Sequence, residues 1–291
     1  MTDAPVEMHA PDLYEHDAVA EPLAGFDAVS ESHIREVFAS QGFLAIADAF
    51  SAEEVEAAKQ GMRDLAMGRV PEFTGIHFED AVADRLEELD AEQRLDGIRK
   101  LMYFVDYSDA LRHLAEHPRL VGLLGRLLAA GADGERVEPV MFQDMGLSKP
   151  PQIGREKPWH QDCAYFDISP ETPVIGVWIA LDEATLENGC MRMLAGGHHV
   201  GPVHHWKRRD WQICDADIRK LRDKQRPVIA APLKPGGALL FNGMLPHGTP
   251  HNSSGLRRRA LQYHYRPADV QALTTEQRLA IYGTEGKDVE C

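Results

Sequence analysis

Two histidines and one aspartate are the residues of this chain whose types and spacing best fit metal chemistry. His160 and Asp162 stand two residues apart, and His247 lies far downstream beside a glycine. Positions i and i+2 of a strand point to the same face, so a strand would present this imidazole and this carboxylate to one point. Two histidines and one carboxylate on one face of a metal, with the other positions open, are typical of non-haem Fe(II) oxygenases. The spacing therefore predicts that His160, Asp162 and His247 bind a catalytic iron.

Other histidines compete for this role. His251 follows His247 by four residues, but its surroundings are typical of an exposed loop. The stretch His77-Phe78-Glu79 repeats the His-x-acid spacing, although about one such pair is expected by chance in a chain with 14 histidines. We interpret that stretch as a loop. The remaining cluster comprises His198, His199, His204 and His205. We interpret its last three members as loop histidines and leave the role of His198 open.

The composition is that of a soluble globular protein with an acidic surface. The 291 residues suffice for one large β domain or two small domains. The formal net charge of −15 argues against binding to nucleic acid or anionic membranes, which needs basic surface. The four cysteines show no CxxC spacing, and neither a signal peptide nor a membrane-spanning apolar run is apparent. We expect a cytoplasmic protein that acts on a small molecule; the oligomeric state is left open.

The elements that must position these residues change character along the chain. Helices are expected over residues 30–39, 51–65, 81–93 and 109–130, and strands over 42–46 and 101–107. Short β-rich runs follow at 137–147, 174–181, 189–195, 227–233, 238–242 and 259–266. Such runs are typical of a jelly roll, with the N-terminal helices packed on one sheet. We expect residues 1–22 to form a flexible arm and residues 23–291 to form a single domain.

Several motifs in chain order resemble those of the phytanoyl-CoA dioxygenase (PhyH) family of Fe(II)- and 2-oxoglutarate-dependent oxygenases. They are Lys149-Pro150-Pro151, Trp159-His160-Gln161-Asp162, Leu186-Glu187-Asn188-Gly189-Cys190, Gly196-Gly197-His198 and His247-Gly248-Thr249, with Arg258 after them. The resemblance covers roughly residues 30 to 266. It implies a double-stranded β-helix, cupin-like and mostly β, whose mouth holds iron and 2-oxoglutarate.

The resemblance also assigns candidate residues to the cosubstrate. An arginine about eleven residues after the distal histidine grips the far carboxylate of 2-oxoglutarate in the family, and here that position is Arg258. The guanidinium fork suits this role because it pairs two carboxylate oxygens at once. Neighbouring Arg257 and Arg259 would point to the other face of the strand. The further positions implied in cosubstrate binding are Thr249, Trp178, Met145, Gln143 and Lys100.

The resemblance implies an enzyme that hydroxylates a small-molecule metabolite with O2 and releases succinate and CO2. Halogenating relatives lack the carboxylate ligand, so the presence of Asp162 favours hydroxylation. The alternatives are a catalytically silent protein and a cupin-type metal-binding protein on the same fold. Two stretches depart from the family pattern: Ala195 replaces the first residue of the usual Pro-Gly-Ser-His turn and Gly197 its serine, and residues 203–226 form an insert that could cap the pocket.

Overall fold

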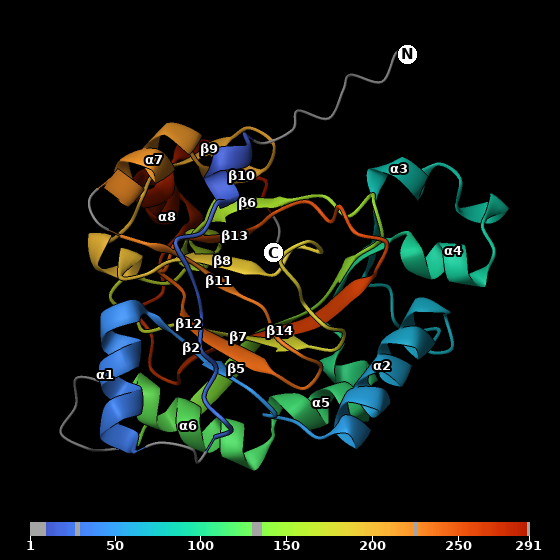
Figure 1. Ribbon diagram of the computed structural model, residues 1–291, viewed down its shortest axis with the longest axis horizontal. Helices are drawn as coiled ribbons and strands as arrows, with labels where there is room; N and C mark the ends of the chain where they lie inside the picture. The colour runs from blue at the N-terminus through green and yellow to red at the C-terminus, as the bar shows by residue number, and fades with distance from the viewer. Residues whose placement is uncertain (1–9, 27–29, 130–135, 224–225, 290–291) are drawn as a thin grey trace.

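Two facing β-sheets with a layer of helices outside one of them make up the computed structural model (Figure 1). It describes residues 10–26, 30–129, 136–223 and 226–289. The seven-stranded sheet has the order β2 (Phe43–Ile46), β12 (Ala238–Asn242), β7 (Ile175–Ala180), β14 (Arg258–Pro267), β5 (Pro139–Lys149), β4 (Ile98–Met102) and β3 (Ile76–Phe78). The five-stranded sheet has the order β1 (Ala18–Val19), β11 (Val228–Ala231), β8 (Met191–Leu194), β13 (His247–Thr249) and β6 (Lys157–His160). This is the mostly β, jelly-roll class predicted, although over the described residues the two sheets do not close into a barrel.

Strand β7 shows how the layers are held together. All six of its residues are buried because both of its faces are covered. Trp178 and Ala180 pack into the core between the two sheets, while Val177 and Ile179 pack into the core under the helices. Alternate strand residues point to opposite faces, so one continuous apolar run serves both cores.

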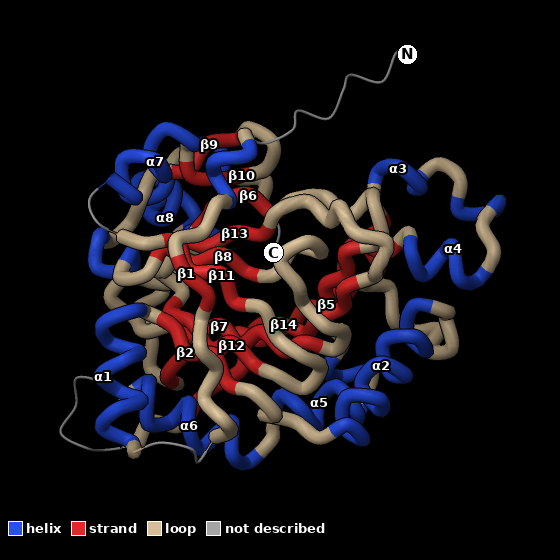
Figure 2. The backbone as a smooth tube through the Cα atoms, viewed as in Figure 1, coloured by secondary structure: helices blue, strands red, loops and turns tan. Residues whose placement is uncertain are grey.

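Four helices cover the outer face of the seven-stranded sheet, along the lower part of the views in Figures 1 and 2. They are α1 (Glu31–Gln41), α2 (Ala52–Ala66), α5 (Asp109–Ala115) and α6 (Pro118–Leu128). Ser51 and Glu54 form a capping box at the start of α2. The leucines of α6 recur at helical spacing and are buried against the sheet: Leu120, Leu123, Leu124, Leu127 and Leu128.

The predicted bounds of one helix and one strand in this part of the chain were wrong. The expected helix over 81–93 is split into α3 (Asp80–Ala83), a 3-10 turn and α4 (Ala91–Asp96), because Asp90 caps a new helix start. The expected strand over 101–107 is β4 and ends at Met102. Tyr103 then adopts a φ of 58°, and the Asp144 carboxylate accepts hydrogen bonds from the backbone N–H groups of Phe104 and Val105. A side chain distant in sequence therefore ends this strand.

The N-terminal segment differs from the flexible arm predicted for residues 1–22. Leu13 is fully buried, and its carbonyl accepts a hydrogen bond from the Trp159 indole at 3.0 Å. Strand β1 pairs in parallel with β11. Residues 10–22 are therefore tied to the body next to the candidate site, while residues 1–9 lie outside the described residues.

The insert after β8 forms its own small layer. Strands β9 (His205–Lys207) and β10 (Trp211–Ile213) pair with each other, and α7 (Asp215–Asp223) follows. Helix α8 (Thr275–Tyr282) lies beside this layer in Figure 1. Among the described residues, none of the helices combines the length and apolar character that crossing a membrane requires.

Candidate metal centre

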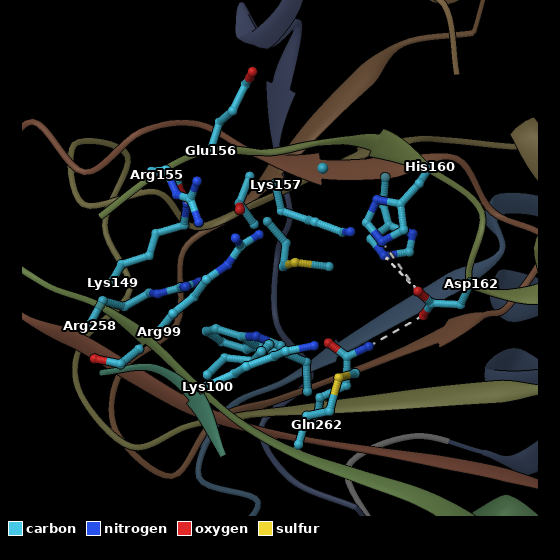
Figure 3. Close-up of a pocket in the computed structure, with 18 of the residues that line it drawn as sticks. Arg99, Lys100, Lys149, Arg155, Glu156, Lys157, His160, Asp162, Arg258 and Gln262 are labelled. Carbon is cyan, nitrogen blue, oxygen red and sulfur yellow. Dashed lines mark hydrogen bonds and ion pairs between the residues drawn. The ribbon is translucent and has the colours of Figure 1, made fainter. Parts of the chain in front are cut away.

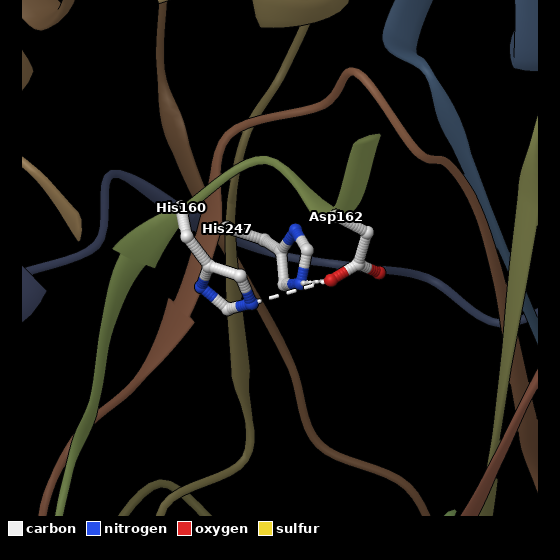
Figure 4. Close-up of side chains that lie close together, drawn as sticks. All are labelled: His160, Asp162 and His247. Carbon is white, nitrogen blue, oxygen red and sulfur yellow. Dashed lines mark ion pairs between the residues drawn. The ribbon is translucent and has the colours of Figure 1, made fainter. Parts of the chain in front are cut away.

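Two adjacent strands of the five-stranded sheet deliver the histidines of the predicted triad. His160 is the last residue of β6, His247 is the first residue of β13, and the two are direct partners in the antiparallel pairing. Asp162 opens the 3-10 helix η4 (Asp162–Tyr165) instead of continuing the strand. Gln161 between them is still extended, so the side chains of residues 160 and 162 reach the same point as predicted, although Asp162 itself lies outside the strand (Figure 4).

The three side chains are buried and close enough to bind one ion. Asp162 Oδ1 lies 3.3 Å from His160 Nε2 and 3.6 Å from His247 Nε2. One ligand atom from each residue falls within 4.8 Å of the others, an arrangement that could hold a metal ion.

Hydrogen bonds to the backbone select the tautomer that a metal needs. His160 Nδ1 lies 2.7 Å from the Pro158 carbonyl, and His247 Nδ1 lies 2.9 Å from the Leu245 carbonyl. A carbonyl only accepts, so each Nδ1 carries the proton and each Nε2 keeps its lone pair for a ligand bond. Burial lowers the pKa of His247 to about 4, which keeps its ring neutral. The donor set fits a divalent transition metal.

The outer oxygen of Asp162 is held by two residues that the sequence reasoning missed. His264 Nε2 lies 2.8 Å from Asp162 Oδ2, and Gln262 Nε2 donates to the same oxygen at 3.3 Å. Burial alone would raise the pKa of Asp162, but the imidazoles of His247 and His264 hold it well below its usual value. The carboxylate is therefore ionised, with Oδ1 turned toward the histidines. Alternation along β14 was the signal available, because residues 258, 262 and 264 share a strand face.

A cavity of about 130 Å³ opens beside the triad (Figure 3). It brings together five of the six residues predicted to bind the cosubstrate, which are Lys100, Met145, Trp178, Thr249 and Arg258. Gln143 is not among the residues that line it. Its side chain lies on β5 opposite His264, buried, with the carbonyl oxygen unpartnered over the described residues. Gln262 lines the cavity in addition.

Arg258 is a buried guanidinium that points toward this cavity. It stacks over the Trp178 ring at 5.3 Å and donates to the Gly189 carbonyl at 3.3 Å. Burial lowers its pKa to about 10, and within the described chain it forms no ion pair with a carboxylate. Arg257 and Arg259, by contrast, point outward and pair with Asp96 and Asp182. The strand register predicted from the sequence is therefore the one observed.

The competing histidines do not join the triad. Among the described residues, His251 belongs to no group that could hold a metal ion. The predicted loop at residues 77–79 includes strand β3, and its Glu79 lines the cavity, where it pairs with Arg155. His198 packs against the Gly42 turn, and His205 is buried beneath Gln161. The insert lines none of the cavity over the described residues, but it supplies charged partners to the wall.

Comparison with known proteins identifies the family. A family model described as phytanoyl-CoA dioxygenase (PhyH) matches residues 38–260, most of the chain. This chain belongs to the PhyH family. A zebrafish (Danio rerio) relative, "Phytanoyl-CoA dioxygenase domain-containing protein 1", is 26% identical over 87% of this chain and 95% of its own length. A "Probable alpha-ketoglutarate-dependent hypophosphite dioxygenase" from Stutzerimonas stutzeri is 25% identical over 81% of this chain and 78% of its own.

Solved structures share the fold of this PhyH protein. The non-heme, alpha ketoglutarate-dependent carbocyclase SnoK superposes with a TM-score of 0.65 at 19% identity, over 90% of this chain and 93% of its own. EctD from S. alaskensis, solved with 2-oxoglutarate and 5-hydroxyectoine, gives a TM-score of 0.65 at 20% identity over 93% of this chain and 87% of its own. At these identities the likeness establishes the shared fold alone.

Proposed function

We propose that this PhyH protein is an Fe(II)- and 2-oxoglutarate-dependent dioxygenase that hydroxylates a small-molecule metabolite. The observation that carries the proposal is the pairing of His160 with His247 across two strands, with Asp162 turned toward both Nε2 atoms. A buried arginine without a carboxylate partner in the described chain, Arg258, lines the same cavity. The two histidines and Asp162 suit iron, and Arg258 suits the far carboxylate of 2-oxoglutarate.

Each residue then has a physical task. His160, Asp162 and His247 hold the metal on one face, and Gln262 and His264 fix the outer carboxylate oxygen so that Asp162 offers Oδ1. Arg258 and Thr249 bind the far carboxylate of 2-oxoglutarate. Trp178 and Met145 supply apolar wall that excludes water.

A bound iron would supply the oxidation, in which 2-oxoglutarate and O2 give succinate and CO2. One oxygen atom of O2 would enter succinate, and the other would become the hydroxyl of the substrate. Asp162 would supply the third protein ligand to the metal, which favours hydroxylation over halide transfer.

The test is a metabolite screen with purified protein, Fe(II), ascorbate and 2-oxoglutarate in air. We expect succinate release that depends on 2-oxoglutarate and O2, together with one metabolite that gains one oxygen atom. Oxygen-independent turnover would indicate a cupin-type isomerase or hydrolase. Absence of succinate under every condition would indicate a catalytically silent binding protein.

A further inference from the structure

Positive side chains outnumber negative ones on the cavity wall. The cations are Arg99, Lys100, Lys149, Arg155, Lys157 and Arg258, and the carboxylates are Glu79, Glu156 and Asp162. The whole chain carries a net charge of −15, so the wall has the opposite sign to the molecule. Figure 3 shows Arg99, Lys149, Arg155 and Arg258 gathered on the side of the cavity away from His160 and Asp162. Such a wall concentrates anions.

Two of these cations are neutralised within the protein. Arg155 pairs with Glu79 at 2.8 Å and also with Asp80. Lys157 pairs with Asp210 of the insert at 2.8 Å. The Glu156 carboxylate is bound to Arg209 of the insert.

Lys149 is buried and has no carboxylate ion pair among the described residues. Its ammonium donates to the backbone carbonyls of Arg155 and Pro250, the latter at 2.8 Å. An ammonium has three N–H donors, so one remains for a ligand. Lys149 is also the direct partner of Arg258 in the β5–β14 pairing. Burial, followed by the nearby charge of Arg258, holds the pKa of Lys149 well below its usual value.

Arg99 is the second cation with spare capacity. Its guanidinium lies 3.6 Å from the Asp210 carboxylate, which is already paired with Lys157 at 2.8 Å. The Arg99 side chain is 33% exposed, which leaves its guanidinium accessible from solvent. Arg99 and Lys149 both line the cavity, and Figure 3 shows them on the same side of it.

2-Oxoglutarate would neutralise only part of the positive charge on the cavity wall. On the proposed function, one carboxylate of 2-oxoglutarate goes to the metal and the other goes to Arg258. We propose that the molecule to be oxidised carries an oxyanion of its own, a carboxylate or phosphoryl group, which Arg99 and Lys149 bind. This inference rests on the proposed function and names the substrate class of the same site. Charge-assisted hydrogen bonds of this kind position a substrate as well as binding it.

The inference is tested by calorimetry on the full chain loaded with Mn(II) and saturating 2-oxoglutarate. The probes are acetate and methyl phosphate, with neutral acetamide for comparison. We expect at least one of the two anions to bind at one further site per chain without displacing 2-oxoglutarate, and acetamide not to bind. Arg99→Gln should weaken anion binding at least tenfold. Arg85→Gln, which removes an exposed arginine elsewhere, should leave it unchanged.

Three results would overturn the inference: no anion site in the 2-oxoglutarate complex, displacement of 2-oxoglutarate by the probe, or anion binding unaltered by Arg99→Gln. Failure of the wild-type protein to bind 2-oxoglutarate at all would overturn the proposed function, and this inference with it. A substrate found by metabolite screening provides a second readout. Its KM should rise at least tenfold in Arg99→Gln while the KM for 2-oxoglutarate stays within twofold, and a substrate without carboxylate or phosphoryl group would contradict the inference.

Discussion

Asp162 is the residue on which the geometry of the metal centre depends most. Its Oδ2 atom contacts His264 at 2.8 Å and Gln262 at 3.3 Å, which leaves Oδ1 facing the two imidazoles. Partners of this kind set ligand orientation, and their loss usually weakens metal binding about 10- to 100-fold. The metal affinity should therefore depend on residues that never touch the metal.

His264→Leu should raise the Fe(II) dissociation constant about tenfold or more, because the outer carboxylate oxygen loses its nearest donor. Anaerobic titration against a metal-sensitive chelator measures this change. His251→Asn, which alters the histidine next in sequence to the triad, serves as the control and should bind iron as the wild type does. Equal affinity in the His264 variant would show that Asp162 is positioned by other means.

Three consecutive arginines provide an internal comparison for cosubstrate binding. Arg258→Gln should raise the KM for 2-oxoglutarate about 30-fold, which corresponds to losing about 2 kcal/mol from hydrogen bonds to a charged group. Arg257→Gln and Arg259→Gln should change it little, since both side chains pair with acids outside the cavity. A large effect from either outer arginine, with none from Arg258, would contradict the assignment.

The periodicity of the apolar residues predicted those helices and strands whose positions depend on the local sequence. Helices α1, α2 and α6 and strands β2, β7 and β12 lie close to where apolar spacing and capping residues placed them. The strand expected over 101–107 failed because the Asp144 carboxylate, distant in sequence, ends it at Met102. Gln262 and His264 were missed for a related reason. Alternation along β14 places them on the face of Arg258, but their contact with Asp162 joins segments distant in sequence.

The metal triad could be predicted because the residue types and their spacing are typical of a metal site. The sequence could not show that His160 and His247 are direct strand partners, since that pairing joins segments 87 residues apart. The expectation of a single domain over 23–291 stays a prediction. Leu13 was a candidate for packing on the body, but a polar segment with few apolar residues does not show that it lies beside Trp159.

Strand β14 and helix α5 are joined by two tyrosine hydroxyls. Tyr263 Oη donates to the Leu111 carbonyl at 2.8 Å, and Tyr265 Oη donates to the Ala115 carbonyl at 2.7 Å. Tyr263→Phe should lower the free energy of unfolding by about 1 kcal/mol, because a buried hydrogen bond is lost without a change in shape. Chemical denaturation measures this, and the KM for 2-oxoglutarate should not move. A change in KM without a loss of stability would contradict the separation of helix layer and site.

For the molecule as a whole, stability should fall in mild acid. His205 Nε2 accepts the backbone N–H of Gln161 at 3.1 Å while its Nδ1 contacts the Val203 carbonyl at 2.7 Å, so the ring is neutral in the fold. Burial lowers the pKa of His205 to about 3, from 6.5. Below pH 6.5 the unfolded chain therefore binds a proton that the folded chain does not, and stability decreases as the pH falls.

Between pH 7 and pH 5 this group alone should remove about 2 kcal/mol of unfolding free energy, at about 1.4 kcal/mol per pH unit below 6.5. Urea denaturation at the two pH values measures the loss. In His205→Gln the part of the slope due to this ring should disappear. A slope that is the same in variant and wild type would assign the acid sensitivity to other groups.

The most direct measurement of the central claim is the visible charge-transfer absorption that appears when 2-oxoglutarate chelates protein-bound Fe(II) without oxygen. The wild-type protein should develop this band with one equivalent of iron, and His160→Ala and Asp162→Ala should lose it. No band in the wild-type protein, or an undiminished band in both variants, would contradict a metal centre built from His160, Asp162 and His247.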